Sequence, residues 1–152
     1  MTRAASSVVG VVVLVGVTVL VAASVGTVAT VDPGGTVPLA HLTLSADAGS
    51  DRVALTHEGG ETLDVAALSV TVSVDGTDLA HQPPVPFFAA TGFESGPTGP
   101  FNVASDDDWS AGETAGFRLA STNDPQLSEG ARVEVVVATG RGVIARLETT
   151  AT

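Results

Sequence analysis

The chain has 152 residues, with 17 acidic side chains, six Arg and no Lys, and its formal net charge is −11. Nucleic acid is excluded as an expected partner, because phosphate binding needs clustered Lys or Arg. The absence of Cys excludes disulfides, thiolate metal sites and a lipid-modified cysteine anchor.

The acidic residues are scattered through segments in which apolar and polar residues alternate, which indicates the solvated surface of a folded domain rather than an acidic tail. Molar salt screens such charges over about 3 Å. The composition is therefore typical of a protein from an extreme halophile.

Residues 5–31 contain no charged side chain and are rich in Val, Ala, Leu and Gly. A helix of about 20 such residues crosses a bilayer core, and a lone segment in lipid satisfies its backbone only as a helix. We therefore expect one transmembrane helix here. Arg3 before it and Asp32 after it predict that the C-terminal domain lies outside the membrane.

Two features of this segment leave alternatives open. Its small residues Gly10, Gly16 and Gly26 indicate either close packing against other copies or the ordinary Gly content of membrane helices. The segment exceeds the apolar region of a secretory signal, about 7 to 15 residues, yet signal-peptidase cleavage near residues 21–23 or 28–30 remains the alternative to a retained helix.

A linker over residues 32–38 begins with Asp-Pro-Gly-Gly, which ends a helix, and residues 39–152 form the acidic domain. Alternation over residues 39–46 and 52–56, with a turn at 48–50, predicts a β-hairpin. A second hairpin is expected from residues 68–74 and 77–81 around Asp75-Gly76, a pair suited to positive φ.

The Pro- and Gly-rich residues 82–100 predict a long loop with room for a short edge strand at residues 87–88. Further strands are expected at residues 117–121, 132–138 and 143–149. The predicted fold class is thus a single N-terminal transmembrane or filament-core helix followed by an all-β antiparallel, immunoglobulin-like sandwich of about seven strands.

Candidate sites are few. His57 lies shortly before Gly59 and Gly60. Two interpretations of this histidine are possible: a metal-binding or catalytic role, or a structural role at the end of a strand. We favour the structural role because no second ligand lies at a zinc-type spacing, and His41 and His81 are dispersed. The run of Asp at residues 106–108 suits either calcium or a solvated loop, and we expect the loop.

The sequence contains no nucleophile-elbow, phosphate-loop or dinucleotide motif, so no catalytic residue, cofactor or metal is predicted and the chain is not expected to be an enzyme. No N-x-S/T sequon occurs, and N-glycosylation is not expected.

Two stretches carry a resemblance. Residues 3–19, RAASSVVGVVVLVGVTV, resemble the N-terminus of archaeal type IV pilins, particularly those of halophiles, although Ser7 stands where the family usually has Pro. Residues 55–64, LTHEGGETLD, resemble the THxGG(D/E)xLD segment of the same proteins. The chain lacks the glutamate that bacterial type IV pilins carry near the mature N-terminus, so the resemblance is to the archaeal branch.

The resemblance implies that a prepilin peptidase removes residues 1–4, with Arg3 and Ala4 ending the leader and Ala5 beginning the mature chain. It also implies that the retained helices bundle into a filament core while the C-terminal domains coat the outside. His57, Gly59 and Gly60 belong to a family segment of unknown role.

We therefore expect a structural subunit of an archaeal type IV pilus-like surface filament that serves surface adhesion, with other subunits, prepilin peptidase and the pilus assembly machinery as partners. Before assembly, one helix holds the protein in the cell membrane. After assembly, the protein is part of the extracellular filament. The alternative is a membrane-tethered, monomeric extracellular binding module whose loop aromatics line a ligand patch; these are Phe87, Phe88, Phe93, Phe101 and Trp109. For the aromatics themselves we favour packing within the loop, because the sequence has few others.

Overall fold

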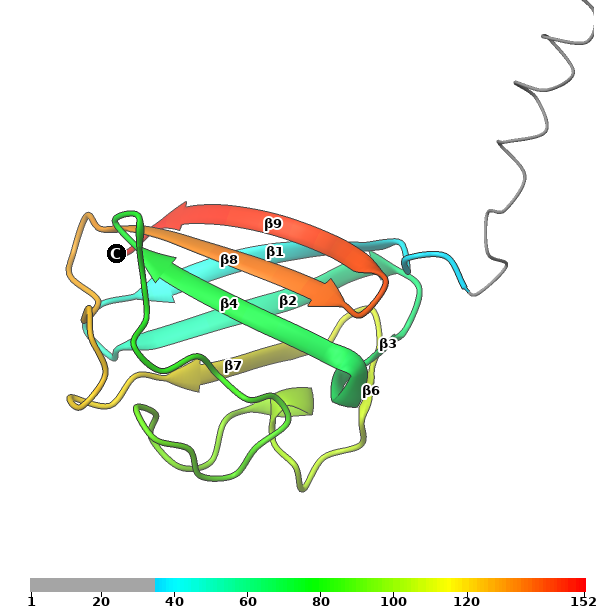
Figure 1. The fold of residues 1–152 in the computed structure, drawn as a ribbon, viewed down its shortest axis with the longest axis horizontal. Helices are drawn as coiled ribbons and strands as arrows, with labels where there is room; N and C mark the ends of the chain where they lie inside the picture. Colours follow the sequence, from blue (N-terminus) through cyan, green and yellow to red (C-terminus); the bar gives the residue numbers. More distant parts are fainter. Residues whose placement is uncertain (1–34) are drawn as a thin grey trace, which may run out of the picture. The chain divides into compact units, whose positions relative to one another are not determined.

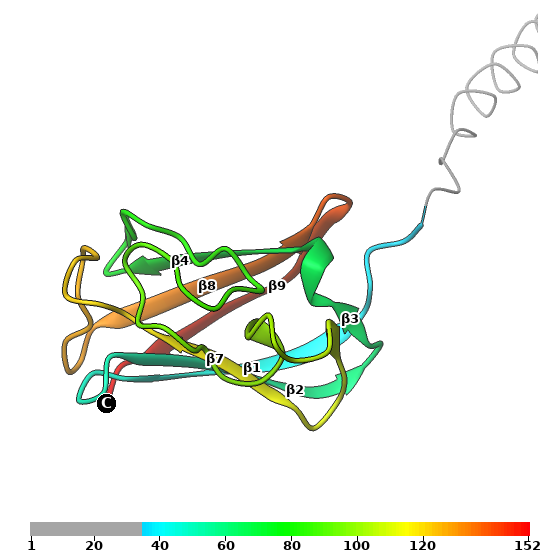
Figure 2. The same cartoon turned by 90° about the horizontal axis from the view of Figure 1, so that it is seen from below.

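The computed structural model describes residues 35–152, of which Thr36–Thr152 form one compact unit. Two antiparallel sheets face each other as a sandwich, with strand orders β1-β2-β7 and β5-β4-β8-β9, and β3 pairs with β6 beside them (Figures 1 and 2). The strands are β1 Ala40–Asp47, β2 Arg52–Gly60, β3 Leu63–Asp64, β4 Leu68–Val74, β5 Thr77–Asp78, β6 Asp108–Trp109, β7 Thr114–Arg118, β8 Arg132–Thr139 and β9 Gly142–Thr150.

The predicted fold class, a helix followed by an immunoglobulin-like sandwich of about seven strands, is wrong for this part of the chain. Residues 35–152 are all-β with nine strands, and their helical pieces are two three-residue 3-10 turns, η1 Val65–Ala67 and η2 Gly99–Phe101. The strand number differs because β3 and β6, which have two residues each, are too short to show an alternating pattern and were not predicted.

The predictions for the N-terminal part of the chain concern residues that the structure does not describe. The leader over residues 1–4, the hydrophobic helix over residues 5–31 and the first part of the linker lie outside the described residues. Within residues 35–152, no helix has the length and apolar character needed to cross a membrane.

Both predicted hairpins form. In the first, Asp47 Oδ1 accepts hydrogen bonds from Gly49 N at 2.8 Å and Ser50 N at 3.3 Å, which holds the turn between β1 and β2. In the second, Asp75 and Gly76 have φ values of 50° and 80°, as the tight turn requires.

Strand β5 ends at Asp78 rather than continuing to residue 81, because a side chain replaces it. Gln82 Oε1 accepts from Val72 N at 2.7 Å, and Gln82 Nε2 donates to Val72 O at 2.9 Å. Leu79 N still donates to Val72 O at 3.0 Å, but the Gln82 amide oxygen takes the place of a strand carbonyl as the acceptor for Val72 N.

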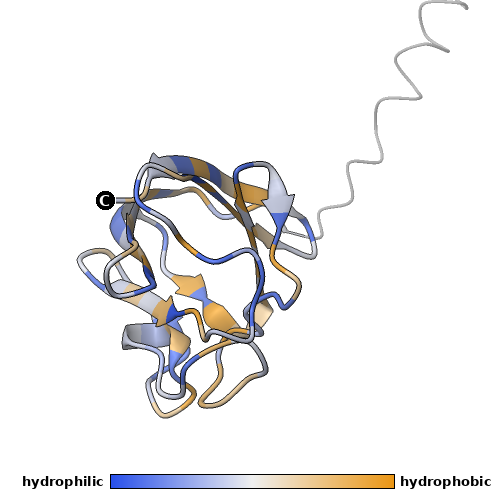
Figure 3. Cartoon of the chain, turned by 90° about the vertical axis from the view of Figure 1, so that its left-hand side faces the viewer, coloured by the Kyte–Doolittle hydropathy of each residue, from blue (hydrophilic) through white to orange (hydrophobic). Residues whose placement is uncertain are grey.

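The core consists mainly of Val and Leu from the inward positions of both sheets. Strand β4 buries Val70, Val72 and Val74 while its intervening Ser and Thr face outward, and β8 buries Val133, Val135 and Val137. Figure 3 shows the alternation as bands along the strands. This period of two is what burial of one sheet face dictates.

The long loop between β5 and β6 closes one side of the sandwich with aromatic rings. Ring centroids are 5.6 Å apart for Phe87 and Phe93, 5.3 Å for Phe93 and Phe117, and 5.3 Å for Phe101 and Trp109. No strand forms at residues 87–88; Phe87 makes only an isolated bridge to Asn102, because the flanking prolines lack N–H donors.

Candidate functional site

Leu39, the last residue before the first strand of the sheet, is bound by Glu61, which directly follows β2. Leu39 immediately precedes β1, and its N–H donates to Glu61 Oε2 at 2.7 Å while its carbonyl accepts from Glu61 N at 2.8 Å. Ala40 pairs with Gly60 in the adjoining register. We call Leu39, His57, Gly60 and Glu61 the junction clasp.

Gly60 makes the close approach of these strands possible. Its φ is +102°, and a Cβ there would lie 2.4 Å from Leu39 O and 2.9 Å from Ala40 Cα. By contrast, a Cβ on Gly59 would meet nothing within 4 Å. Of the two adjacent glycines, Gly60 alone is required by the backbone.

His57 is a core residue of the clasp. It continues the inward-facing positions of Val53 and Leu55 along β2 and is fully buried. Its ring lies edge-to-face against Trp109, with centroids 5.9 Å apart and an interplanar angle of 77°.

The His57 ring fixes the clasp through one hydrogen bond. His57 Nε2 lies 2.8 Å from Glu61 O, and because a carbonyl only accepts, Nε2 carries the hydrogen. His57 Nδ1 is buried and has no partner among the described residues. The ring therefore orients the Glu61 peptide rather than facing a substrate.

A β-bulge sets the geometry of the clasp. Leu42 pairs with His57 and His41 pairs with Gly59, so Glu58 is the extra residue on β2. The Glu58 side chain turns outward and accepts from Thr43 Oγ1 at 2.9 Å. The bulge lets His57 point into the core while the next residues bend toward Leu39.

Apolar surface surrounds the clasp. Leu39 is 79% exposed, and Val143, at the start of β9, is also exposed. Val37 lies against the backbone of Gly142, where a Cβ would come within 2.9 Å of Val37 Cγ2. A hollow of about 470 Å³ beside the clasp is lined by residues including Pro38, Leu63 and Arg141.

The remaining candidate residues from the sequence are either outside the described residues or do not form a metal site within them. Residues Arg3, Ala4, Ala5, Gly10, Gly16 and Gly26 lie outside the described residues. His41 and His81 are exposed and remote in sequence from the buried His57, and no three metal-ligand side chains converge anywhere in residues 35–152. The three Asp at residues 106–108 form an exposed loop and strand, and the carbonyl of Asp107 accepts from Val65 N at 2.8 Å.

The loop aromatics pack in the core, as favoured, and do not form the ligand patch of the alternative. Four of its five residues, namely Phe87, Phe93, Phe101 and Trp109, are buried in the core, and only Phe88 is exposed, at 58%. Their ring-to-ring contacts show that they hold the long loop against β7.

Sequence reasoning also missed two residues. Glu61 stood in the quoted family segment without a role, and its position directly after Gly-Gly was the available signal. Asn123, buried between loops, accepts from His81 N and donates to the carbonyls of His81 and Gly92 at 3.0 and 3.1 Å, contacts that no local pattern reveals.

No protein-family model matches the chain, and no curated protein matches it. The likeness to archaeal type IV pilins therefore rests on residues 3–19 and 55–64 alone, the second of which contains three of the four clasp residues.

Proposed function

We propose that this chain is a structural subunit of an archaeal type IV pilus-like surface filament, serving surface adhesion. The uncharged residues 5–31 would hold the precursor in the cell membrane and then join subunits, while the acidic β-domain is displayed outside. Prepilin peptidase, the assembly machinery and other copies of the chain are its partners.

One observation carries the proposal: the pilin-like residues 55–64 lie at the junction between the N-terminal part of the chain and the domain. In a filament, tension between the subunit and its displayed domain passes through Leu39. Leu39 N donates to the Glu61 carboxylate and Leu39 O accepts from Glu61 N, and the buried His57 ring holds the Glu61 carbonyl in turn, so the backbone at Leu39 is secured.

The decisive experiment is the N-terminal sequence and intact mass of the protein isolated from its native envelope, with electron microscopy of sheared surface material. We expect a mature chain beginning at Ala5, present in long polymers. An intact Met1 or Thr2, with only membrane-extracted monomer, would instead favour the tethered binding module. A start beyond residue 21 would indicate an ordinary secreted domain.

A further inference from the structure

Two arginines lie directly opposite each other on adjacent strands. Arg52 of β2 pairs in register with Arg118 of β7, and both line a pocket of about 260 Å³ whose other wall is the loop over residues 94–98. Like charges at opposed positions of an antiparallel pair destabilise a sheet. The arrangement is unexpected in a chain that has only six basic side chains.

Among residues 35–152, one carboxylate forms an ion pair with these two cations. Arg118 Nη1 lies 3.0 Å from Glu94 Oε2, and Arg118 Nε donates to Ser50 O at 2.9 Å. Within the described part of the chain, Arg52 forms no ion pair, and its guanidinium donates a single hydrogen bond, to Thr98 Oγ1 at 3.2 Å. Most N–H donors of Arg52 thus remain available to a ligand.

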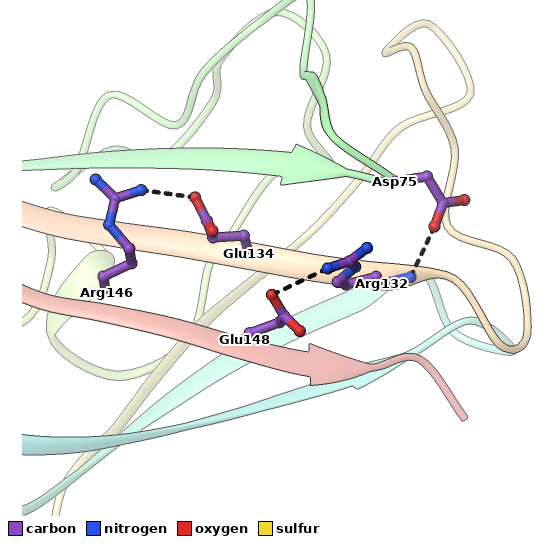
Figure 4. Close-up of polar contacts among 5 residues, drawn as sticks. All are labelled: Asp75, Arg132, Glu134, Arg146 and Glu148. Atoms are coloured by element: carbon purple, nitrogen blue, oxygen red, sulfur yellow. Dashed lines mark hydrogen bonds and ion pairs between the residues drawn. The ribbon is translucent and has the colours of Figure 1, made fainter.

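Arginines on the other sheet show the contrast. Arg146 Nη1 lies 2.8 Å from Glu134 Oε1, and Arg132 Nη1 lies 3.6 Å from Glu148 Oε2. Figure 4 shows both pairs. Each of these cations has its own carboxylate. Among the described residues, Arg52 and Arg141 have no carboxylate partner, and of these two only Arg52 lies opposite another arginine on an adjacent strand and lines this pocket.

The pocket wall is fixed before any ligand binds. Thr98 N donates to Gly116 O at 2.8 Å, Gly116 N donates to Thr98 O at 3.1 Å, and Glu94 N donates to Arg118 O at 2.9 Å. These hydrogen bonds hold the loop against the edge of β7. Binding of a ligand therefore loses little conformational entropy of the loop.

We propose that this pocket binds a small organic molecule through a terminal oxyanion, a carboxylate or a sulfate, of the size of one acidic sugar. The planar guanidinium fork matches the two oxygens of such a group, and Arg52 is its principal ligand, with Arg118 second and the hydroxyls of Ser95 and Thr98 at the rim. The pocket volume of about 260 Å³ is near the lower end of small-molecule sites, about 300 Å³, so the pocket itself accommodates one group of this size. The inference goes beyond the proposed function and holds for a filament subunit or a monomer alike.

The test is calorimetric titration of the full chain in detergent micelles at low ionic strength, with sodium glucuronate, glucose 6-sulfate and neutral glucose as probes. We expect saturable binding of at least one anionic probe and none of glucose. Their relative affinities distinguish a carboxylated from a sulfated ligand. Arg52→Gln weakens binding by about tenfold or more, because a charge-assisted pair is lost, and Arg52→Lys, which keeps the charge without the fork, weakens it less.

The matched control is Arg146→Gln, which removes the same charge from the other sheet and leaves the affinity within about twofold, as expected for screened charges at a distance. Absence of saturable binding by both anions would overturn the proposal. Equal binding of glucose, or an equal loss in Arg52→Gln and Arg146→Gln, would overturn it as well. Thermal melts of the variants establish that each is folded when it is titrated.

Discussion

At the scale of single residues, two adjacent glycines of the junction clasp have different roles. Gly60 has a φ of +102° and no room for a Cβ beside Leu39 O, whereas Gly59 has open space. We expect Gly60→Ala to lower the free energy of unfolding by about 2 to 4 kcal/mol, from backbone strain and a forced shift of β1. Gly59→Ala is the control and changes it by less than about 1 kcal/mol. Chemical denaturation of both variants measures these free energies. Equal losses in the two variants would show that position 60 does not require glycine more than position 59 does.

Asn123 is the residue on which the loops converge. It is 2% exposed; its Oδ1 accepts from His81 N and Asp124 N, and its Nδ2 donates to the carbonyls of His81 and Gly92. Asn123→Ala removes four hydrogen bonds at part-buried or buried positions, although Gly92 O keeps its bond from Ala120 N, and we expect a loss of about 3 kcal/mol in the free energy of unfolding. Asn102→Ala, which removes two hydrogen bonds from a half-buried side chain, should cost about 1 kcal/mol. A similar loss in the two variants, measured by urea unfolding, would count against this role for Asn123.

At the scale of elements, the long loop is part of the core rather than a flexible connection. Phe101 is fully buried between Trp109 and Phe117, whereas Phe88 of the same loop is 58% exposed. We expect Phe101→Ala to cost about 3 to 5 kcal/mol, through lost burial and the cavity it leaves. Phe88→Ala serves as the control, with an expected change below about 1 kcal/mol. Near-equal midpoints of thermal unfolding for the two variants would mean that the loop does not stabilise the sandwich.

Elements with a long alternating pattern were predictable from the sequence. Leu68–Val74 has the predicted bounds, and the Asp75-Gly76 turn has the predicted positive φ. The two-residue strands β3 and β6 were not predictable, since two residues show no period, whereas the position of β5 followed from the turn before it.

The sites depended on pairings that a sequence does not display. The clasp joins Leu39 to Glu61, 22 residues apart, through a bulge that shifts the register by one residue. The arginine pocket depends on Arg52 and Arg118 meeting across β2 and β7, which no local pattern specifies. Local periodicity thus yields strands, whereas strand pairing yields sites.

At the scale of the whole molecule, the surface charge is largely uncompensated. Three ion pairs form within residues 35–152, all between partly exposed side chains, and such pairs each contribute about 0 to 1 kcal/mol. In two of these ion pairs the carboxylates also face each other, because Glu134 of β8 and Glu148 of β9 are paired in register. Arg146 binds Glu134 and Arg132 binds Glu148, each from a diagonal position (Figure 4). Repulsion among the remaining carboxylates therefore opposes folding at low ionic strength.

This balance predicts that salt stabilises the domain. Raising KCl from about 0.1 M to about 2 M shortens the screening length from about 10 Å to below about 3 Å, so the midpoint of thermal unfolding should rise by at least about 4 °C, equivalent to roughly 1 kcal/mol. Replacing Asp106, Asp107 and Asp108 together by Asn removes three exposed charges without touching the core, and should raise the midpoint in low salt while flattening its dependence on KCl. An unchanged slope in that variant would mean that salt acts through apolar burial rather than through charge screening, because the Val-rich core is the same in both proteins.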